Sequence, residues 1–418
     1  MTEIIIHSVI EYLEIINEYT NDSDKIYFRG ESKLYEERIP GIYRTISENT
    51  KLKYPKLVLE GTKEYFYDLF SEFGWSLHGN KLFEQIVNAQ HFGAVTSILD
   101  ITSNPLAALY FAASGNFNED GNIFIYETKE NSVKRYFGHT ISLMTALNFV
   151  SRKEINNFIR LFNALLHEIP IDSKLGKSIF KQKITLNKLL DTLENSFNIP
   201  ETTYVFDLKR IDYLKNPFKA YDFDLLYKDE GNDSNNISNC IQSEVEAKRR
   251  ILQFIKKVDP NLDDRFYNLE QIESSNLKIK EYQEYLLQKI NEIITSFLDS
   301  LNQVSVNTDK FIYPYAIYED MQKSFIVYPT RLNERIKNQK GAFIIPGYFL
   351  IEELNINKIQ TNIKATMNKC IEEKARIIID SKSKKQILNQ LHQLGIDEGF
   401  IYPDIEHIAK TISDKYEN

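Results

Sequence analysis

Residues 90–112, QHFGAVTSILDITSNPLAALYFA, indicate the end of one helix, then a strand, then a second helix. Gly93 ends a predicted helix, and the apolar run at 95–101 that follows predicts a strand. Pro105 then starts a second helix, because proline is favoured in the first helical turn. Residues 105–112 are apolar on every side, so we expect this helix in the core.

Strands and helices are predicted on both sides of this stretch. The chain begins with a short strand and an amphipathic helix, and residues 25–29, KIYFR, alternate as a strand does before Gly30. Residues 311–350 have strand-and-turn character. Further predictions are one helix at 56–74, a helix at 81–91, a strand at 122–127, a strand at 375–380, and helices at 383–395 and 403–416.

The middle of the chain has a different character. Residues 140–168, 178–196, 242–257 and 265–303 show helical periodicity. The prediction is an α+β fold whose split, mixed β-sheet core is formed by residues 1–130 and 311–418. A mostly helical insertion at 131–310 separates the two halves. Distant parts of the sequence would then meet in one cleft.

Composition limits the classes of function. A net charge of −8 and a pI near 5.6 argue mildly against wholesale nucleic-acid binding, which needs a basic face. The two cysteines, Cys240 and Cys370, show no metal-binding or disulfide spacing, so we expect no metal. The N-terminus lacks the features of a signal peptide, and no apolar run is long enough to span a membrane. We therefore expect a cytoplasmic protein without membrane contact.

Four segments together resemble the FRG family, which is named for its Phe-Arg-Gly motif. They are residues 27–32, 90–112, 333–343 and 395–404, and the second is the longest and most specific. Two positions depart from the family. Ser97 stands where members usually carry arginine, and Ile101 stands where they usually carry tryptophan.

The residues also predict a site without the family name. Arg29 ends a strand, where its guanidinium can offer two parallel hydrogen bonds to a phosphate or carboxylate. Gly30 allows close approach of a ligand or of another backbone. Asp100 lies in an apolar strand and, if buried, needs a cationic partner, for which Arg29 and Arg335 are the candidates. Such a pair can organise the fold or serve a ligand, and both alternatives stay open.

A second, lower-level resemblance is to the R-S-E class of ADP-ribosyltransferases, carried by residues 27–30. It implies an ADP-ribosyltransferase-like core with NAD as substrate. Together with the FRG motifs, it leads us to predict Arg29, His91, Thr102 and Gln339 as catalytic residues. The predicted cofactor-binding residues are Arg29, Gly30, Gln90, Thr96, Asp100 and Arg335. Gln339 falls where the class carries glutamate, so Glu334 or another carboxylate would have to supply the missing negative charge, or the site is inactive.

These observations lead to one hypothesis and two rivals. The hypothesis is an NAD- or nucleotide-binding protein that performs ADP-ribosyl transfer or NAD cleavage, as a bacterial toxin or anti-phage defence effector. Its acceptor would be a protein or a nucleic acid. The first rival is a non-catalytic module that binds a ligand or a protein, with the helical insertion as partner surface. The second, a nuclease, lacks a carboxylate cluster with metal-like spacing.

Overall fold

The computed structural model describes residues 2–20, 26–35, 37–46, 51–75, 82–129, 131–167, 279–304, 310–312, 314–330, 334–413 and 416. Contacts divide the chain into two compact units. The first comprises Met1–Leu59, Tyr67–Ala146 and Asp320–Asn418, and the second comprises Glu60–Phe66 and Leu147–Glu319. The predicted helices at 178–196 and 242–257 lie outside the described residues, and the predicted domain boundaries stay a prediction.

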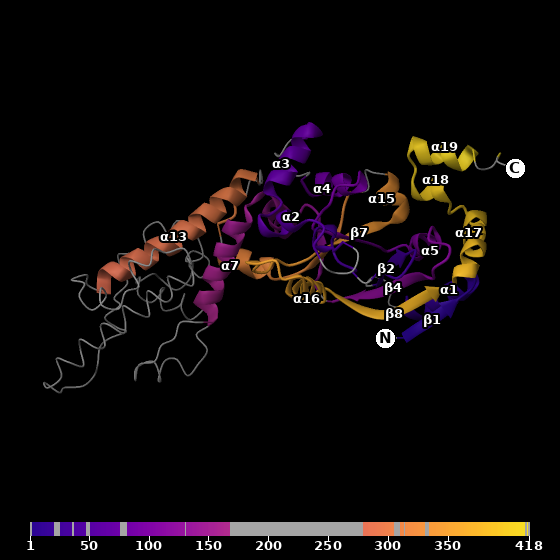
Figure 1. The fold of residues 1–418 in the computed structure, drawn as a ribbon, viewed down its shortest axis with the longest axis horizontal. Helices are drawn as coiled ribbons and strands as arrows, with labels where there is room; N and C mark the ends of the chain where they lie inside the picture. The colour runs from indigo at the N-terminus through magenta and orange to yellow at the C-terminus, as the bar shows by residue number, and fades with distance from the viewer. Residues whose placement is uncertain are drawn as a thin grey trace, which may run out of the picture. The chain divides into compact units, whose positions relative to one another are not determined.

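The first unit is built on a mixed eight-stranded sheet in the order β1-β8-β4-β2-β3-β7-β6-β5 (Figure 1). Its two outer pairs, β1 with β8 and β5 with β6, are parallel, and all inner pairs are antiparallel. The strands are β1 (Thr2–Ile6), β2 (Ile26–Glu31), β3 (Leu99–Thr102), β4 (Gly121–Thr128), β5 (Val133–Arg135), β6 (Phe325–Tyr328), β7 (Gly341–Ile345) and β8 (Ile371–Ile379). The prediction of an α+β fold with a mixed sheet is confirmed.

Helices join these strands. The α-helices of the described residues are α1 (Val9–Tyr19), α2 (Pro55–Leu59), α3 (Lys63–Glu72), α4 (Leu82–His91), α5 (Pro105–Ala113), α6 (His139–Ala146), α7 (Arg152–His167), α13 (Ile279–Val304), α14 (Pro314–Met321), α15 (Glu334–Gln339), α16 (Ile356–Met367), α17 (Lys384–Gln393), α18 (Glu398–Ile401) and α19 (Ile405–Ser413). Short 3-10 helices are η2 (Gly41–Tyr43), η4 (Leu147–Phe149) and η9 (Ser381–Ser383).

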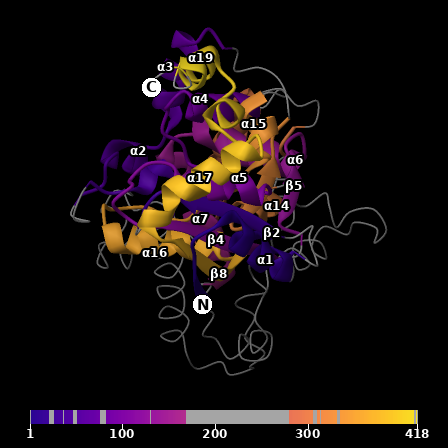
Figure 2. The ribbon, with the colours of Figure 1, turned by 90° about the vertical axis from the view of Figure 1, so that its right-hand side faces the viewer.

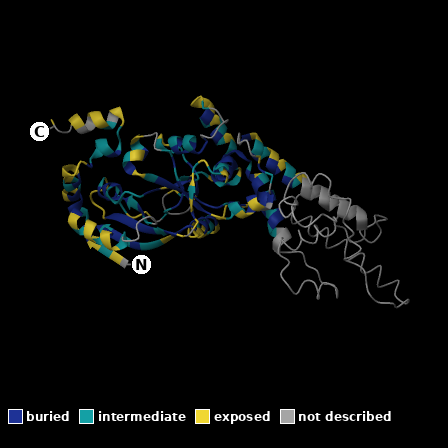
Figure 3. Ribbon diagram, turned by 180° about the vertical axis from the view of Figure 1, so that it is seen from behind, coloured by how far each residue is buried: buried dark blue, intermediate teal, exposed yellow. Residues whose placement is uncertain are grey.

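Each face of the sheet carries its own core, because alternate side chains of a strand point to opposite faces. One core packs α1, α5 and α17 against residues such as Phe28, Ile123 and Ile377 (Figure 2). The other packs α2, η2 and α16 against the alternate residues, among them Tyr27 and Phe124. In Figure 3 the strands of this unit are largely buried, and exposed residues gather on the outer helices.

Helix α5 lies unusually close to the sheet at two glycines. A Cβ atom added to Gly30 would stand 1.9 Å from the carbonyl oxygen of Ala108, and one added to Gly121 would stand 2.2 Å from that of Ala112. The close approach predicted at Gly30 is therefore made by the backbone of α5. This helix begins as predicted, with Pro105 in its first turn and the Asn104 side chain as N-cap.

The described helices of the second unit pack through aromatic side chains. Phe158 of α7 stacks on Phe297 of α13 with ring centroids 4.0 Å apart, and Phe162 stacks on Tyr318 at 5.0 Å. The carboxylate of Glu154 also accepts a hydrogen bond of 2.6 Å from the Ser300 hydroxyl. No helix among the described residues is both long and apolar enough to cross a membrane.

Three of the predicted elements were wrong in detail. The single helix predicted at 56–74 is broken into α2 and α3 by Gly61, whose φ of +95° is left-handed and does not suit a helix. The predicted strand at 95–101 is the shorter β3, which begins only at Leu99. Part of the strand-and-turn region at 311–350 is helix α14, because Pro314 occupies the first helical position.

Candidate functional site

The site begins where the sheet splits between β2 and β3. These strands pair at a single position, Phe28 opposite Thr102, whereas β2 pairs with β4 along its whole length. β3 pairs in turn with β7 over all four of its residues. Arg29 lies just past the last β2–β3 pair. Its Nη1 donates a hydrogen bond of 2.8 Å to the main-chain carbonyl oxygen of Asp100 in β3. A side chain therefore bonds to β3 at a point where the main chain of β2 does not pair with it.

A cleft of about 490 Å³ lies at this split. β2, β3 and β7 line it together with the ends of α4 and α5, helix α15 and Tyr402 at the end of α18. Both halves of the predicted core contribute, as the sequence analysis expected. The candidates Arg29, Gly30, Gln90, His91, Asp100, Thr102, Arg335 and Gln339 all line the cleft, and Thr96 does not.

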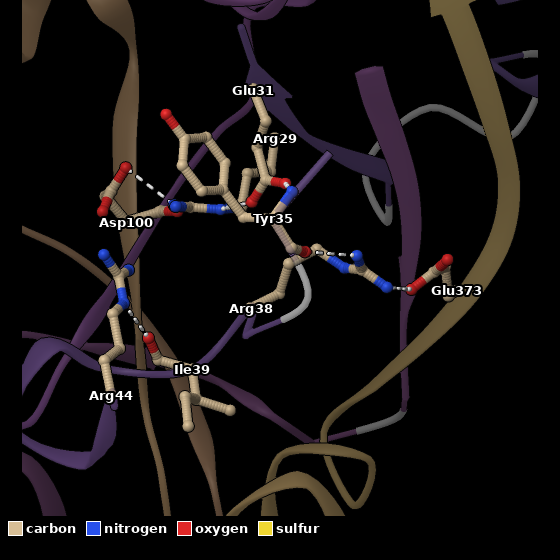
Figure 4. A network of polar contacts seen from close by, with 8 residues as sticks. All are labelled: Arg29, Glu31, Tyr35, Arg38, Ile39, Arg44, Asp100 and Glu373. Atoms are coloured by element: carbon tan, nitrogen blue, oxygen red, sulfur yellow. Dashed lines mark hydrogen bonds and ion pairs between the residues drawn. The ribbon is translucent and has the colours of Figure 1, made fainter. Parts of the chain in front are cut away.

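Arg29 is held between two carboxylates (Figure 4). Its Nε donates 3.0 Å to Glu31 Oε1, and its Nη1 donates 2.9 Å to Asp100 Oδ2. The two acids differ in exposure, because the side chain of Glu31 is 2% exposed and that of Asp100 is 60% exposed. Asp100 is therefore the carboxylate that is open to a ligand, and Arg29 and Glu31 form the rigid base beneath it.

This arrangement keeps the pair charged. Burial is the largest single influence and raises the pKa of Asp100. The charges of Arg29 and Arg44 and the hydrogen bonds to the carboxylate together outweigh burial, so that pKa lies below its ordinary value. Burial alone would lower the pKa of Arg29, but the charges of Asp100 and Glu31 outweigh that effect and raise it. The cleft thus presents a fixed, ionised carboxylate at neutral pH.

A second row of residues supports the loop after β2. Arg38 donates 3.2 Å to the carbonyl oxygen of Tyr35, lies 3.9 Å from the ring centre of Phe124, and pairs with Glu373 at 3.7 Å (Figure 4). The main-chain NH of Tyr35 donates 3.4 Å to Glu31, which ties the loop to the Arg29 pair. The exposed Tyr35 ring is thereby held at the cleft.

Arg44 adds a cation beside this group. Its Nε donates 2.9 Å to the carbonyl oxygen of Ile39, and Figure 4 shows its guanidinium directed toward Asp100. Burial, followed by the nearby charge of Arg29, lowers the pKa of Arg44.

His91 forms part of the cleft as a neutral ring. Burial, reinforced by the charge of Arg335, lowers its pKa to about 4, so it carries no charge at neutral pH. Its Nε2 atom is buried and has no hydrogen-bond partner among the described residues. The ring lies edge-on to Phe343 at 6.2 Å. His91 therefore acts as a proton donor or acceptor only if a ligand or a local movement exposes Nε2.

The neighbouring Gln90 is oriented by a hydrogen bond from a residue outside the cleft. The hydroxyl of Thr96 donates to Gln90 Oε1, and Thr96 is itself buried. Thr96 was predicted to contact NAD directly. In the structure it orients a cleft residue instead.

Thr102 and Gln339 are occupied by internal hydrogen bonds. The Thr102 hydroxyl donates 2.5 Å to the main-chain oxygen of Gln339 and accepts from the NH of Asn104 at 2.8 Å. The Gln339 side chain donates 2.9 Å to the carbonyl oxygen of Ile401. Both residues are buried, and these contacts join β3, α15 and α18 into one wall of the cleft.

Arg335 and two rings form the opposite side. The guanidinium carbon of Arg335 lies 4.5 Å from the ring centre of Tyr402, a cation–π contact, and Tyr402 packs edge-on against Phe111 at 6.3 Å. Glu334 precedes Arg335, but its side chain is 62% exposed, pairs with Lys337 and does not line the cleft. Glu334 therefore lies outside the cleft, whereas the carboxylates of Glu31 and Asp100 line it and that of Asp100 is the more exposed.

Several cleft residues were not predicted. Glu31 could have been found, because it lies two residues after Arg29 in a strand and so shares its face. Phe111 lies within the motif segment 90–112 but was interpreted as part of the core helix, and Tyr35 lies outside the four motif segments. Among the described residues, no group of three or more His, Cys, Asp or Glu side chains is arranged to hold a metal ion.

Comparison with known proteins agrees with the two motif segments at 27–32 and 90–112. The FRG domain family model matches residues 24–121, which contain β2, α4, β3 and α5. Residues 24–121 therefore form an FRG domain. No curated protein and no solved structure matches it. The resemblance to ADP-ribosyltransferases stays a prediction.

Proposed function

We propose that the cleft binds a nucleotide-type ligand, and that the protein uses NAD in ADP-ribosyl transfer or NAD cleavage. The observation that carries this proposal is the exposed, ionised Asp100, fixed by Arg29 in a cleft that also holds Arg335 and aromatic rings. A volume of about 490 Å³ lies within the range of small-molecule sites, about 300–1,000 Å³.

The groups in the cleft match the parts of a dinucleotide. The rings of Tyr35 and Phe111 line the cleft and offer surfaces on which a base can stack, whereas Tyr402 is itself stacked on His407. The guanidinium of Arg335 can face a phosphate, with which arginine makes charge-assisted hydrogen bonds. Asp100 accepts hydrogen bonds from hydroxyl groups. Base, phosphate and sugar can thus each be recognised by a different wall.

The proposed reaction needs a carboxylate at the sugar. The bond between the nicotinamide nitrogen and ribose C1′ breaks, and its electron pair leaves with nicotinamide. Water or an acceptor group then bonds to C1′ and releases a proton to solvent. The ribose carries positive charge in the transition state, which a fixed negative charge stabilises. Asp100 supplies that charge, whereas Gln339 is neutral and bonded to Ile401.

The experiment measures nicotinamide release from NAD by purified protein, together with transfer of labelled ADP-ribose to protein and nucleic-acid acceptors. Arg29→Ala should abolish turnover, because Asp100 loses its partner. Arg376→Ala is the matched control, since Arg376 forms an ion pair with Glu3 away from the cleft. Circular dichroism checks that both variants fold. NAD consumption that survives in Arg29→Ala contradicts the proposed site.

A second function, a non-catalytic binding module, is favoured by one observation. The predicted catalytic groups of Thr102 and Gln339 are buried and used within the protein. Saturable NAD binding without turnover, with every acceptor and with host extract, would support this module. The segment 131–310, predicted as partner surface, would then be the place to search for a protein partner.

A further inference from the structure

We infer that Asp100 is a ribose-recognition group, and that the cleft selects nucleotides with a free 2′-hydroxyl over 2′-deoxy and 2′-phosphorylated ones. This inference rests on the proposed function, because it names the part of the nucleotide that Asp100 contacts.

The first argument is the placement of Asp100. Its neighbours in β3, Leu99 and Ile101, are buried, whereas the Asp100 side chain is 60% exposed and lines the cleft. Nη1 of Arg29 binds both its main-chain oxygen, at 2.8 Å, and its Oδ2 atom, at 2.9 Å. The carboxylate is therefore fixed on one side. No other described side chain donates a hydrogen bond to it, so Oδ1 can accept one from a ligand.

The second argument is the local balance of charge. The guanidinium of Arg29 already faces two carboxylates, those of Asp100 and Glu31. The charge of Arg44, whose guanidinium is directed toward Asp100, balances the second carboxylate. His91 is neutral and does not add a positive charge. Because the charges around Asp100 are balanced within the protein, a neutral hydrogen-bond donor such as a hydroxyl can bond to its carboxylate without leaving an uncompensated charge. Arg29, which was predicted to pair with a phosphate or a carboxylate, pairs with two carboxylates and serves in this inference as a positioning residue.

The third argument is the chemistry of ribose. An acidic side chain recognises ribose by accepting hydrogen bonds from its hydroxyls. Removal of the 2′-hydroxyl leaves a desolvated carboxylate oxygen without its donor. A phosphate at the 2′ position brings like charge against Asp100 and Glu31. Both changes should weaken binding, the first by loss of a hydrogen bond and the second by repulsion between like charges.

The experiment uses ligands with a single ribose, so that the sugar in contact is not ambiguous. Calorimetry of the full chain compares ADP with 2′-deoxy-ADP, and AMP with adenosine 2′,5′-bisphosphate. We expect the ligand with the free 2′-hydroxyl to bind at least about tenfold more tightly in each pair. In Asp100→Asn this preference should fall to within about threefold, because the neutral amide neither repels phosphate nor accepts as strongly. Glu334→Gln, which changes an exposed carboxylate outside the cleft, should keep the wild-type preference.

The outcomes separate the inference from the proposed function. Equal binding of ADP and 2′-deoxy-ADP to wild-type protein overturns the inference but leaves nucleotide binding intact. A preference that persists in Asp100→Asn assigns ribose recognition to another residue and also overturns it. Absence of binding by ADP, NAD and ADP-ribose overturns both. The wild-type comparison needs no variant and therefore does not depend on how Asp100→Asn folds.

Discussion

Replacement of Gly30 by alanine should push helix α5 away from the sheet. The added Cβ would stand 1.9 Å from the carbonyl oxygen of Ala108, well inside the 3.0 Å that real Cβ atoms respect. The obstacle is backbone, so no side chain can rotate to relieve it. Overpacking of this kind typically costs about 1–3 kcal/mol, and we place Gly30→Ala at about 3 kcal/mol because a whole helix must move.

The assay follows unfolding through Trp75, the single tryptophan of the chain, which packs against Phe70 in the first unit. For a unit of this size, about 3 kcal/mol lowers the unfolding temperature by roughly 6–12 °C. Gly341→Ala is the matched control. It also changes a strand glycine of the cleft, but its nearest contact would be 3.7 Å, so stability should change by less than about 1 kcal/mol. If Gly30→Ala unfolds at the wild-type temperature, the reasoning about α5 is refuted.

Three further predictions concern buried titratable groups. Lys384 donates to three main-chain carbonyl oxygens near the ends of β2 and α5, so Lys384→Met should lower the free energy of unfolding by about 2–3 kcal/mol; an unchanged urea midpoint would contradict this. His91 has a pKa of about 4 when folded, below its ordinary value of 6.5, so the unfolded state binds the proton between these values. Stability should therefore fall as pH decreases from about 6.5 to 4, by at most about 3 kcal/mol, and His91→Gln should flatten that part of the pH–stability profile; an equally steep profile in the variant speaks against it. Burial raises the pKa of Cys370 to about 12, so its thiol should not react in the native protein. In the Cys240→Ser variant, a thiol reagent should label Cys370 only after unfolding, and rapid labelling of the native variant would contradict this prediction.

Local patterns were sufficient for much of the fold. The strand β2 and the start of α5 followed from alternation and from Pro105, because both signals act within a few residues. The prediction failed at Pro314, which lies in the region predicted to have strand-and-turn character but begins helix α14. A proline marks a boundary, and the sequence around it does not always say which kind of element follows.

The sequence predicted many of the residues that line the cleft, but it did not predict which of them contact one another. The motifs indicated Arg29 and Asp100, but their pairing depends on where β2 and β3 part, which no local pattern shows. The hydrogen bond from Thr102 to Gln339 joins residues more than two hundred positions apart, so the sequence could not show that these groups are occupied. The same holds for Tyr402 against Arg335.

The most direct test of the central claim is a crystal structure of the protein grown with saturating ADP. We predict a nucleotide in the cleft between β2 and β3, with a ribose hydroxyl about 3 Å from the Asp100 carboxylate and the ion pair to Arg29 preserved. A nucleotide bound elsewhere on the protein, or a cleft that stays without ligand at saturating ADP, would contradict it.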